Sequence, residues 1–274
     1  IFPTETSPYA DVLLPGVTFA EKTGTFTNTE RRVQMVRKAI EPPGEARQDW
    51  EIITEIAKRV MSVQSSVISE QLRKIDVTAP WAKWDYTSPA DIMAEINALA
   101  PSYGGITHER LERGETLQWP CPSADHPGTP ILHTKGFARG KGKFMPIDFV
   151  PPAERPDDEY PMILSTGRVL YHWHGGEMSR RASGLLEIYS QAQVEINPSD
   201  AERLGLNGKK RVRVTSRRGV IESEAWVTER VPPGMVYANF HFPEASANEL
   251  TIAALDPVSK IPSYKVCAVR VEAV

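Results

Sequence analysis

Residues 160–184 read YPMILSTGRVLYHWHGGEMSRRASG, and they join a short apolar run to a stretch rich in polar, planar and cationic side chains. The apolar letters predict a strand. Thr166 and Gly167 at its end supply a hydroxyl group and an unencumbered backbone, and Arg168 offers a planar fork of N–H donors suited to a phosphate. We interpret the stretch as a strand end that grips a large anionic cofactor. The alternative is a surface loop with ordinary solvated arginines.

The pattern of short strands continues from this stretch to the C-terminus. Turn signals such as SRRG and VPPG separate segments that alternate or run apolar. One short helix is expected to interrupt them, with Asn197 or Ser199 near its start, Pro198 in its first turn and Gly205 as its end. About six strands with one or two short helices are typical of a small closed β-barrel. The expected strands contain MILS, QVEIN, KRVRVTS, VIESEAWV, GMVYANF and YKVCAVRVEAV.

Residues 1–115 carry helical patterns instead. The segment 49–61, DWEIITEIAKRVM, has Asp49 as a plausible N-cap and places Ile52, Ile53, Ile56, Ala57 and Val60 on one face.

A second helix is expected in TSPADIMAEINALA, residues 87–100. Ser88 would cap it, Pro89 would occupy its first position, and Ile92, Ile96 and Leu99 would form its buried stripe.

Residues 116–154 are rich in Pro and Gly, which favours an extended linker with one edge strand. They separate the helical part, 1–115, from the strand-rich part, 155–274.

Composition argues against several classes of protein. The net charge of -3 disfavours a general binder of nucleic acid or anionic membranes, because such proteins need a surplus of Lys and Arg. Cys121 and Cys267 lie far apart, so neither a disulfide framework nor an iron–sulfur motif is expected, and a reducing, cytoplasmic location is favoured. No apolar run approaches the roughly 18 residues needed to cross a bilayer. The opening IFPTETSPYADVLLPG lacks the layout of a signal peptide, and we expect it to come from the middle of a longer chain.

A second candidate patch lies in EKTGTFTNTERRVQ, residues 21–34. Gly24, Thr25 and Asn28 belong to a turn dense in small donors, and Glu30 follows it. A carboxylate beside amide-type donors suits the edge of guanine, whose N1–H and N2–H groups need an acceptor. The alternative is an exposed hairpin tip.

A third candidate patch contains Asn248, Tyr264 and Lys265, which lie just before apolar strands and so can face a barrel mouth.

The histidines allow a competing interpretation. His172 and His174 form an H-x-H pair, and His241 in NFHF is a candidate third ligand for zinc. No carboxylate or Cys follows at ligand spacing, and histidines packed in a core or stacked on other rings are the commoner outcome.

Five stretches together resemble the C-terminal third of the molybdenum- or tungsten-dependent formate dehydrogenases, in the dimethyl sulfoxide reductase superfamily. The likeness covers essentially the whole chain and is weakest around residues 115–150. The stretches are ETSPYADVLLPGVTFAEKTGTFTNTERRVQ, DWEIITEIAKRV, YPMILSTGRVLYHWH, ANELT and DPVSKIPSYKVCAVRVE.

The resemblance implies a fold and a cofactor. Residues 1–115 would complete an α/β segment of a molybdopterin oxidoreductase domain, and residues 155–274 would form a double-psi β-barrel. Together they would hold bis-molybdopterin guanine dinucleotide with molybdenum or tungsten. The residues implied to contact it are Gly24, Thr25, Asn28, Glu30, Thr166, Gly167, Arg168, His172, His174, Phe240, Asn248, Tyr264 and Lys265.

The resemblance also implies an activity. Family members oxidise formate reversibly to carbon dioxide and pass electrons to iron–sulfur clusters. Their metal ligand and cluster cysteines belong to the N-terminal remainder of the subunit, so we assign no catalytic or metal-binding residue here. Partner subunits that carry clusters, flavin and an NAD site are expected from the family. Assimilatory nitrate reductase, a zinc protein and a non-catalytic nucleotide-binding module are the alternatives.

Overall fold

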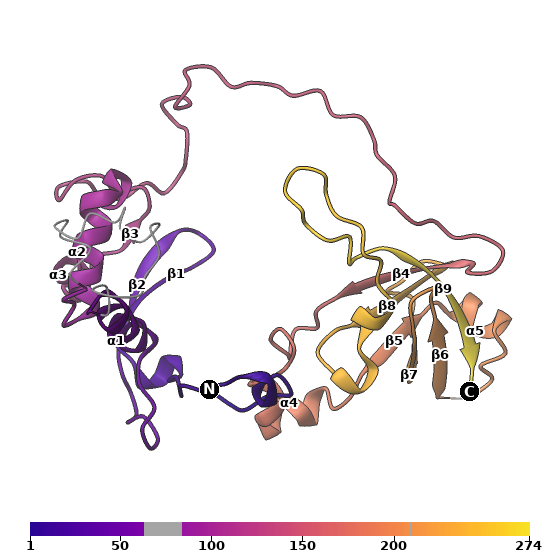
Figure 1. The fold of residues 1–274 in the computed structure, drawn as a ribbon. Helices are drawn as coiled ribbons and strands as arrows, with labels where there is room; N and C mark the ends of the chain where they lie inside the picture. The colour runs from indigo at the N-terminus through magenta and orange to yellow at the C-terminus, as the bar shows by residue number, and fades with distance from the viewer. Residues whose placement is uncertain (63–83, 209) are drawn as a thin grey trace. The chain divides into compact units, whose positions relative to one another are not determined.

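The computed structural model describes residues 1–62, 84–208 and 210–274 (Figure 1). The chain divides into two compact units, Ile1–Phe144 and Met145–Val274. Each unit has a hydrophobic core of its own. The division falls inside the segment 116–154 that the sequence predicts as a linker.

In its described residues, 1–62 and 84–144, the first unit combines a small sheet with three α-helices. Its antiparallel sheet has the order β1-β2-β3, so β3 forms an edge strand. Met93, Ile106 and Leu117 are among the buried residues of its core. The elements are β1 (Gly24–Thr27), β2 (Arg32–Val36), α1 (Asp49–Ser62), α2 (Pro89–Leu99), α3 (His108–Glu112) and β3 (Leu117–Gln118).

The helix α2 confirms its predicted cap and corrects its predicted stripe. The Ser88 hydroxyl accepts from the Asp91 amide, while the Asp91 carboxylate accepts from the Ser88 amide, and Pro89 begins the helix. However, Met93 is the buried residue of this helix, whereas Ile96 and Leu99 are 39% and 61% exposed. Periodicity identifies an apolar face but does not say how far a neighbouring element covers it.

The helix α1 also differs from its prediction in detail. The carbonyl of Gln48 accepts from the amides of Glu51 and Ile52, so Gln48 occupies the cap position and Asp49 lies in the first turn. The apolar side chains on the face of this helix are largely exposed, and Thr54 is its buried residue. The exposed members are Ile53, Ile56 and Val60.

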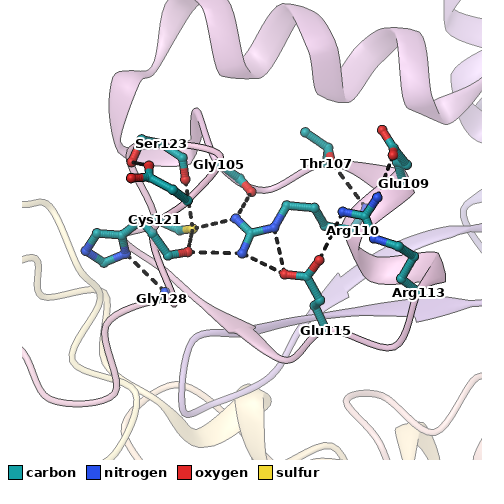
Figure 2. Close-up of polar contacts among 11 residues, drawn as sticks. Gly105, Thr107, Glu109, Arg110, Arg113, Glu115, Cys121, Ser123 and Gly128 are labelled. Atoms are coloured by element: carbon teal, nitrogen blue, oxygen red, sulfur yellow. Dashed lines mark hydrogen bonds and ion pairs between the residues drawn. The ribbon is translucent and has the colours of Figure 1, made fainter.

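A buried arginine organises the segment that leads into and out of β3 (Figure 2). Arg110 is 8% exposed, and its guanidinium donates to the Glu115 carboxylate at 2.8 Å and to the Gly105 and His126 carbonyls at 2.7 and 3.1 Å. It also donates to the Cys121 sulfur at 3.6 Å. Its partners span residues 105–126, so the Pro-rich chain around β3 packs into the first unit rather than leaving it as a free strand.

The second unit is a closed barrel of six strands, and the predicted barrel is confirmed (Figure 1). Its order is β4-β8-β5-β7-β6-β9. The pairs β4–β8 and β5–β7 are parallel and the other pairs are antiparallel, a mixed barrel consistent with the predicted double-psi fold. The strands are β4 (Met162–Gly167), β5 (Gln193–Ile196), β6 (Arg211–Thr215), β7 (Val220–Val227), β8 (Met235–Asn239) and β9 (Cys267–Ala273).

Long connections carry the remaining structure of the barrel unit. The chain between β4 and β5 contains α4 (Ser183–Ile188), and α5 (Pro198–Arg203) follows β5. Asn197 caps α5 by accepting from the Ser199 amide, and Gly205 has a φ of 66°, so the predicted start and end of this helix are confirmed. No helix in the described ranges has the length and apolar character to span a membrane.

A buried carboxylate fastens the chain that leads into the barrel. Glu154 accepts from Arg217 at 2.8 Å, from Arg218 at 2.7 Å through each oxygen, and from the Ala268 amide of β9 at 3.0 Å. These bonds lower the pKa of Glu154 from 4.5 to about 2, with the Arg218 hydrogen bonds as the largest cause, although burial acts in the opposite direction. The chain before β4 is therefore tied to the turn between β6 and β7 and to β9.

Candidate functional site

The end of β4 is shaped by a close approach between Gly167 and Tyr237. The strands β4 and β8 run parallel and pair Gly167 with Asn239. A Cβ atom on residue 167 would lie 2.7 Å from the Tyr237 hydroxyl oxygen, so only glycine fits without displacement. The Tyr237 hydroxyl donates to the carbonyl of Arg168 at 2.7 Å. This contact fixes the direction in which the chain leaves the barrel.

Arg168 is exposed and lies against an aromatic ring. Its guanidinium carbon is 5.3 Å from the ring centroid of Phe240, which directly follows β8. A guanidinium that stacks through its flat face keeps its N–H groups at the edge available for a ligand. The structure therefore brings two of the predicted contact residues together.

The segment before β9 also reaches the end of β4. The buried Thr166 hydroxyl donates to the carbonyl of Tyr264 at 2.5 Å. Lys265 is exposed, with its ammonium nitrogen 5.9 Å from the Tyr264 ring centroid. Six predicted contact residues thus belong to segments that meet at this end of β4: Thr166, Gly167, Arg168, Phe240, Tyr264 and Lys265.

Two of the three candidate histidines use both ring nitrogens in protein hydrogen bonds. His172 is buried and bonds the Ser179 hydroxyl at 3.1 Å and the Tyr189 carbonyl at 2.7 Å. His241 is fully buried; it accepts from the Val169 amide at 2.8 Å and bonds the His174 carbonyl at 2.5 Å. Burial is the largest cause that lowers the pKa of His241.

These bonds oppose the zinc interpretation, because a metal would have to displace them. Over the described ranges, no group of three or more His, Cys, Asp or Glu side chains could hold a metal ion. The His174 side chain is exposed and packs at the edge of Trp173, with ring centroids 4.8 Å apart.

The predicted residues of the first unit fall into two places on one hairpin. Asn28 closes the β1–β2 turn by accepting from the amides of Glu30 and Arg32 at 3.1 and 2.9 Å. The Glu30 carboxylate accepts from the Asn28 amide group at 3.2 Å and lies 3.1 Å from the Arg32 Nε. Gly24 and Thr25 lie at the opposite end of β1.

A pocket of about 270 Å³ lies beside that opposite end. Gly24 and Thr25 line it together with apolar side chains of α1 and α2 such as Trp50 and Met93.

Asn248 belongs to a different segment of the barrel unit from the residues at the end of β4. It lies exposed in a short 3-10 helix, Ala247–Leu250. The Leu250 carbonyl of that helix accepts from Arg218, which ties the helix to the β6–β7 turn.

The barrel also carries a polar cluster that was not predicted from the sequence. Glu195 and Tyr237 pair across β5 and β8 and point away from the core, which holds their neighbours in each strand. Glu195 is nonetheless 3% exposed, and burial raises its pKa while Arg230 at 3.5 Å opposes this. Asn239 donates to the Tyr189 hydroxyl at 3.1 Å, and burial is the main reason that the pKa of Tyr189 rises to about 12.

In the sequence, this cluster is marked only by the polar residues Glu195, Tyr237 and Asn239 at alternate positions of predicted strands. That alternation does not indicate that the chain between β4 and β5 packs against these side chains.

Two family models match the chain. The Molydopterin dinucleotide binding domain matches residues 162–268, which hold the barrel, and the Molybdopterin oxidoreductase model matches residues 1–59. The chain belongs to the molybdopterin oxidoreductase family.

Curated relatives of this molybdopterin oxidoreductase chain include alpha subunits of formate dehydrogenases. It is 46% identical over 274 residues to the F420-dependent formate dehydrogenase subunit alpha of Methanocaldococcus jannaschii, and the alignment covers 99% of the chain and 38% of the relative. It is 43% identical, with the same coverage, to subunit alpha of F420-dependent formate dehydrogenase 2 of Methanococcus maripaludis. It is 34% identical to the assimilatory nitrate reductase catalytic subunit of Bacillus subtilis, covering 99% of the chain and 37% of that relative.

The chain spans 38% of the length of the two formate dehydrogenase relatives. Among solved structures, acetylene hydratase from Pelobacter acetylenicus superposes with a TM-score of 0.64 at 15% identity, covering 95% of this chain and 38% of that one. This likeness shows that the molybdopterin oxidoreductase chain shares its fold.

Proposed function

We propose that the end of β4 binds part of bis-molybdopterin guanine dinucleotide, with molybdenum or tungsten as its metal. The observation that carries the proposal is the gathering of Thr166, Arg168, Phe240 and Lys265 around a strand end where Gly167 admits no side chain. The exposed cations Arg168 and Lys265 fit a diphosphate, because a guanidinium or ammonium group donates hydrogen bonds to its oxygens and a backbone without a side chain lets it approach closely. His174, Asn248 and Tyr264, which are all exposed, complete the proposed contacts on the barrel. The predicted contact of the His172 side chain is not proposed, because its ring is buried and both ring nitrogens bond Ser179 and Tyr189.

We further propose that Gly24, Thr25, Asn28 and Glu30 contact a dinucleotide tail of the same cofactor. A carboxylate has about four lone-pair positions, so the bonds from Asn28, Arg32 and Gln118 leave Glu30 with about one acceptor position for a guanine edge.

The reaction that we propose for the whole enzyme is the reversible oxidation of formate to carbon dioxide, with electrons passed to iron–sulfur clusters. Support comes from the 46% and 43% identity to formate dehydrogenase alpha subunits, against 34% for the nitrate reductase. When bound, the cofactor supplies the two-electron redox chemistry, and the residues of this chain hold and orient it.

We propose partner subunits that carry electrons onward, since these relatives are alpha subunits, and a cytoplasmic location. Because both relatives are F420-dependent, the electron acceptors to be tested in activity assays are F420, NAD, ferredoxin and quinone.

Replacement of Arg168 by Ala in the complete enzyme tests the cofactor site. Loss of charge-assisted hydrogen bonds is expected to weaken cofactor retention roughly 10- to 100-fold, measured as pterin and metal content after dialysis. Arg270→Ala is the matched control, because Arg270 is an exposed arginine on β9 that pairs with Glu272. Full pterin and metal content in Arg168→Ala would refute the assignment, and faster turnover of nitrate than of formate would refute the proposed reaction.

A further inference from the structure

The loop Val169–His174 is held at both ends by one side chain. It leaves β4 directly after Arg168 and returns to the barrel through His174. The His241 ring accepts from the Val169 amide at 2.8 Å and bonds the His174 carbonyl at 2.5 Å. A single ring thus bridges the first and last residues of the loop.

The two partners define how this ring is protonated. A backbone amide can only donate and a carbonyl can only accept, so Nε2 of His241 is the acceptor and Nδ1 carries the proton. The ring is fully buried, with its centroid 5.3 Å from that of Phe240 and 5.7 Å from that of His172. This packing holds the neutral ring in one orientation.

The chain beyond the loop also packs closely on residue 241. Gly176 has a φ of 83°, and a Cβ atom there would lie 2.8 Å from the carbonyl oxygen of His241. His174 itself has a φ of 45°, an uncommon left-handed conformation for a residue with a side chain. The bond from the His241 ring to the His174 carbonyl restrains this conformation.

We infer that His241 is a positioning residue that fixes the loop Val169–His174 and thereby presents Arg168 and His174 to the cofactor. The fixing of the loop follows from the hydrogen bonds, whereas the identity of the ligand rests on the proposed function. The role differs from that of a metal ligand, because both ring nitrogens serve the protein backbone.

Two partial mimics separate the two bonds in the complete enzyme. The amide group of Asn can replace Nδ1 and donate to the His174 carbonyl, while the longer Gln can replace Nε2 and accept from the Val169 amide. His241→Leu removes both bonds. His126→Gln is the matched control, because His126 also accepts from a backbone amide, that of Gly128 at 3.0 Å, but belongs to the first unit.

Residue-resolved amide hydrogen exchange reports each end of the loop. The Val169 amide reports one end, and the Gly176 amide, which donates to the Trp173 carbonyl, reports the other. His241→Asn is expected to accelerate exchange at Val169, and His241→Gln at Gly176, each on the order of tenfold. His241→Leu is expected to accelerate both, and His126→Gln neither. Unchanged exchange at Val169 and Gly176 in His241→Leu would overturn the inference, whatever the cofactor content.

Pterin content distinguishes the inference from the proposed function. Faster exchange accompanied by lower pterin content, measured by fluorescence of the extracted and oxidised pterin, supports both. Faster exchange with full pterin and metal content supports the fixing of the loop by His241, but overturns the role of the loop in presenting Arg168 and His174 to the cofactor.

Discussion

Replacement of Glu154 by Gln removes one negative charge from the cluster that ties the chain before β4 to β9 and to the β6–β7 turn. The shape of the side chain is nearly preserved, so the change tests charge rather than packing. Arg218 loses its charged acceptor, Arg217 keeps only the Asp157 carboxylate, and the Ala268 amide loses a charged partner. The free energy of unfolding is therefore expected to fall.

The size of the effect follows from the pKa of Glu154. A pKa of about 2 in the folded chain, against an ordinary value of 4.5 for a glutamate, corresponds to ~3 kcal/mol of folding free energy. The side chain is 8% exposed, so solvent screens this contribution only weakly. Because the folded pKa is lowered, the contribution is present above pH 4.5 and disappears as the pH falls from 4.5 to about 2.

Urea unfolding of the chain and of Glu154→Gln at several pH values measures both features. At pH 7 we expect the variant to lose ~3 kcal/mol, and we expect the difference to vanish near pH 2. Glu222→Gln is the matched control: Glu222 also pairs with an arginine, Arg213 at 2.7 Å, but its side chain is 38% exposed, so a loss below ~1 kcal/mol is expected. Equal stability of Glu154→Gln and the unchanged chain at pH 7 would refute the reasoning.

Two further substitutions test close contacts. Gly167→Ala places a Cβ atom 2.7 Å from the Tyr237 hydroxyl and is expected to lower stability in thermal unfolding by ~1–3 kcal/mol. Gly184→Ala is the control, because the space around residue 184 is open, and it is expected to unfold like the parent chain. Equal melting temperatures for the parent and both variants would contradict the described packing. Arg110→Lys removes the fork that bonds Glu115 and two carbonyls and is expected to lower stability against urea by ~2–3 kcal/mol, an expectation that an unchanged unfolding midpoint would exclude.

Local patterns sufficed to predict the elements of the structure. Alternation predicted the six barrel strands, and side-chain chemistry predicted the Ser88 cap, because both signals act over a few residues. For the start of α5 it offered Asn197 or Ser199, and Asn197 is the cap. Burial was less predictable. The apolar face of α2 was predicted from its periodicity. Which residue of that helix is buried depends on tertiary packing, and it is Met93.

The residues proposed to bind the cofactor could be chosen from the sequence, but the contacts that support them could not. The exposed Arg168 and Lys265 could be proposed from local chemistry and the family resemblance. The supporting roles of Tyr237 and His241 were not predicted, because they depend on the parallel pairing of β4 with β8. That pairing joins segments about 70 residues apart. No local signal encodes such a pairing.

The barrel closes only when its final strand is in place, since β9 bridges β4 and β6. The bond from Thr166 to Tyr264 likewise joins residues 98 positions apart. During translation, a nascent polypeptide that has exposed β4 but not yet released β9 from the ribosome cannot hold this geometry. The contacts at the end of β4 are therefore coupled to completion of the barrel.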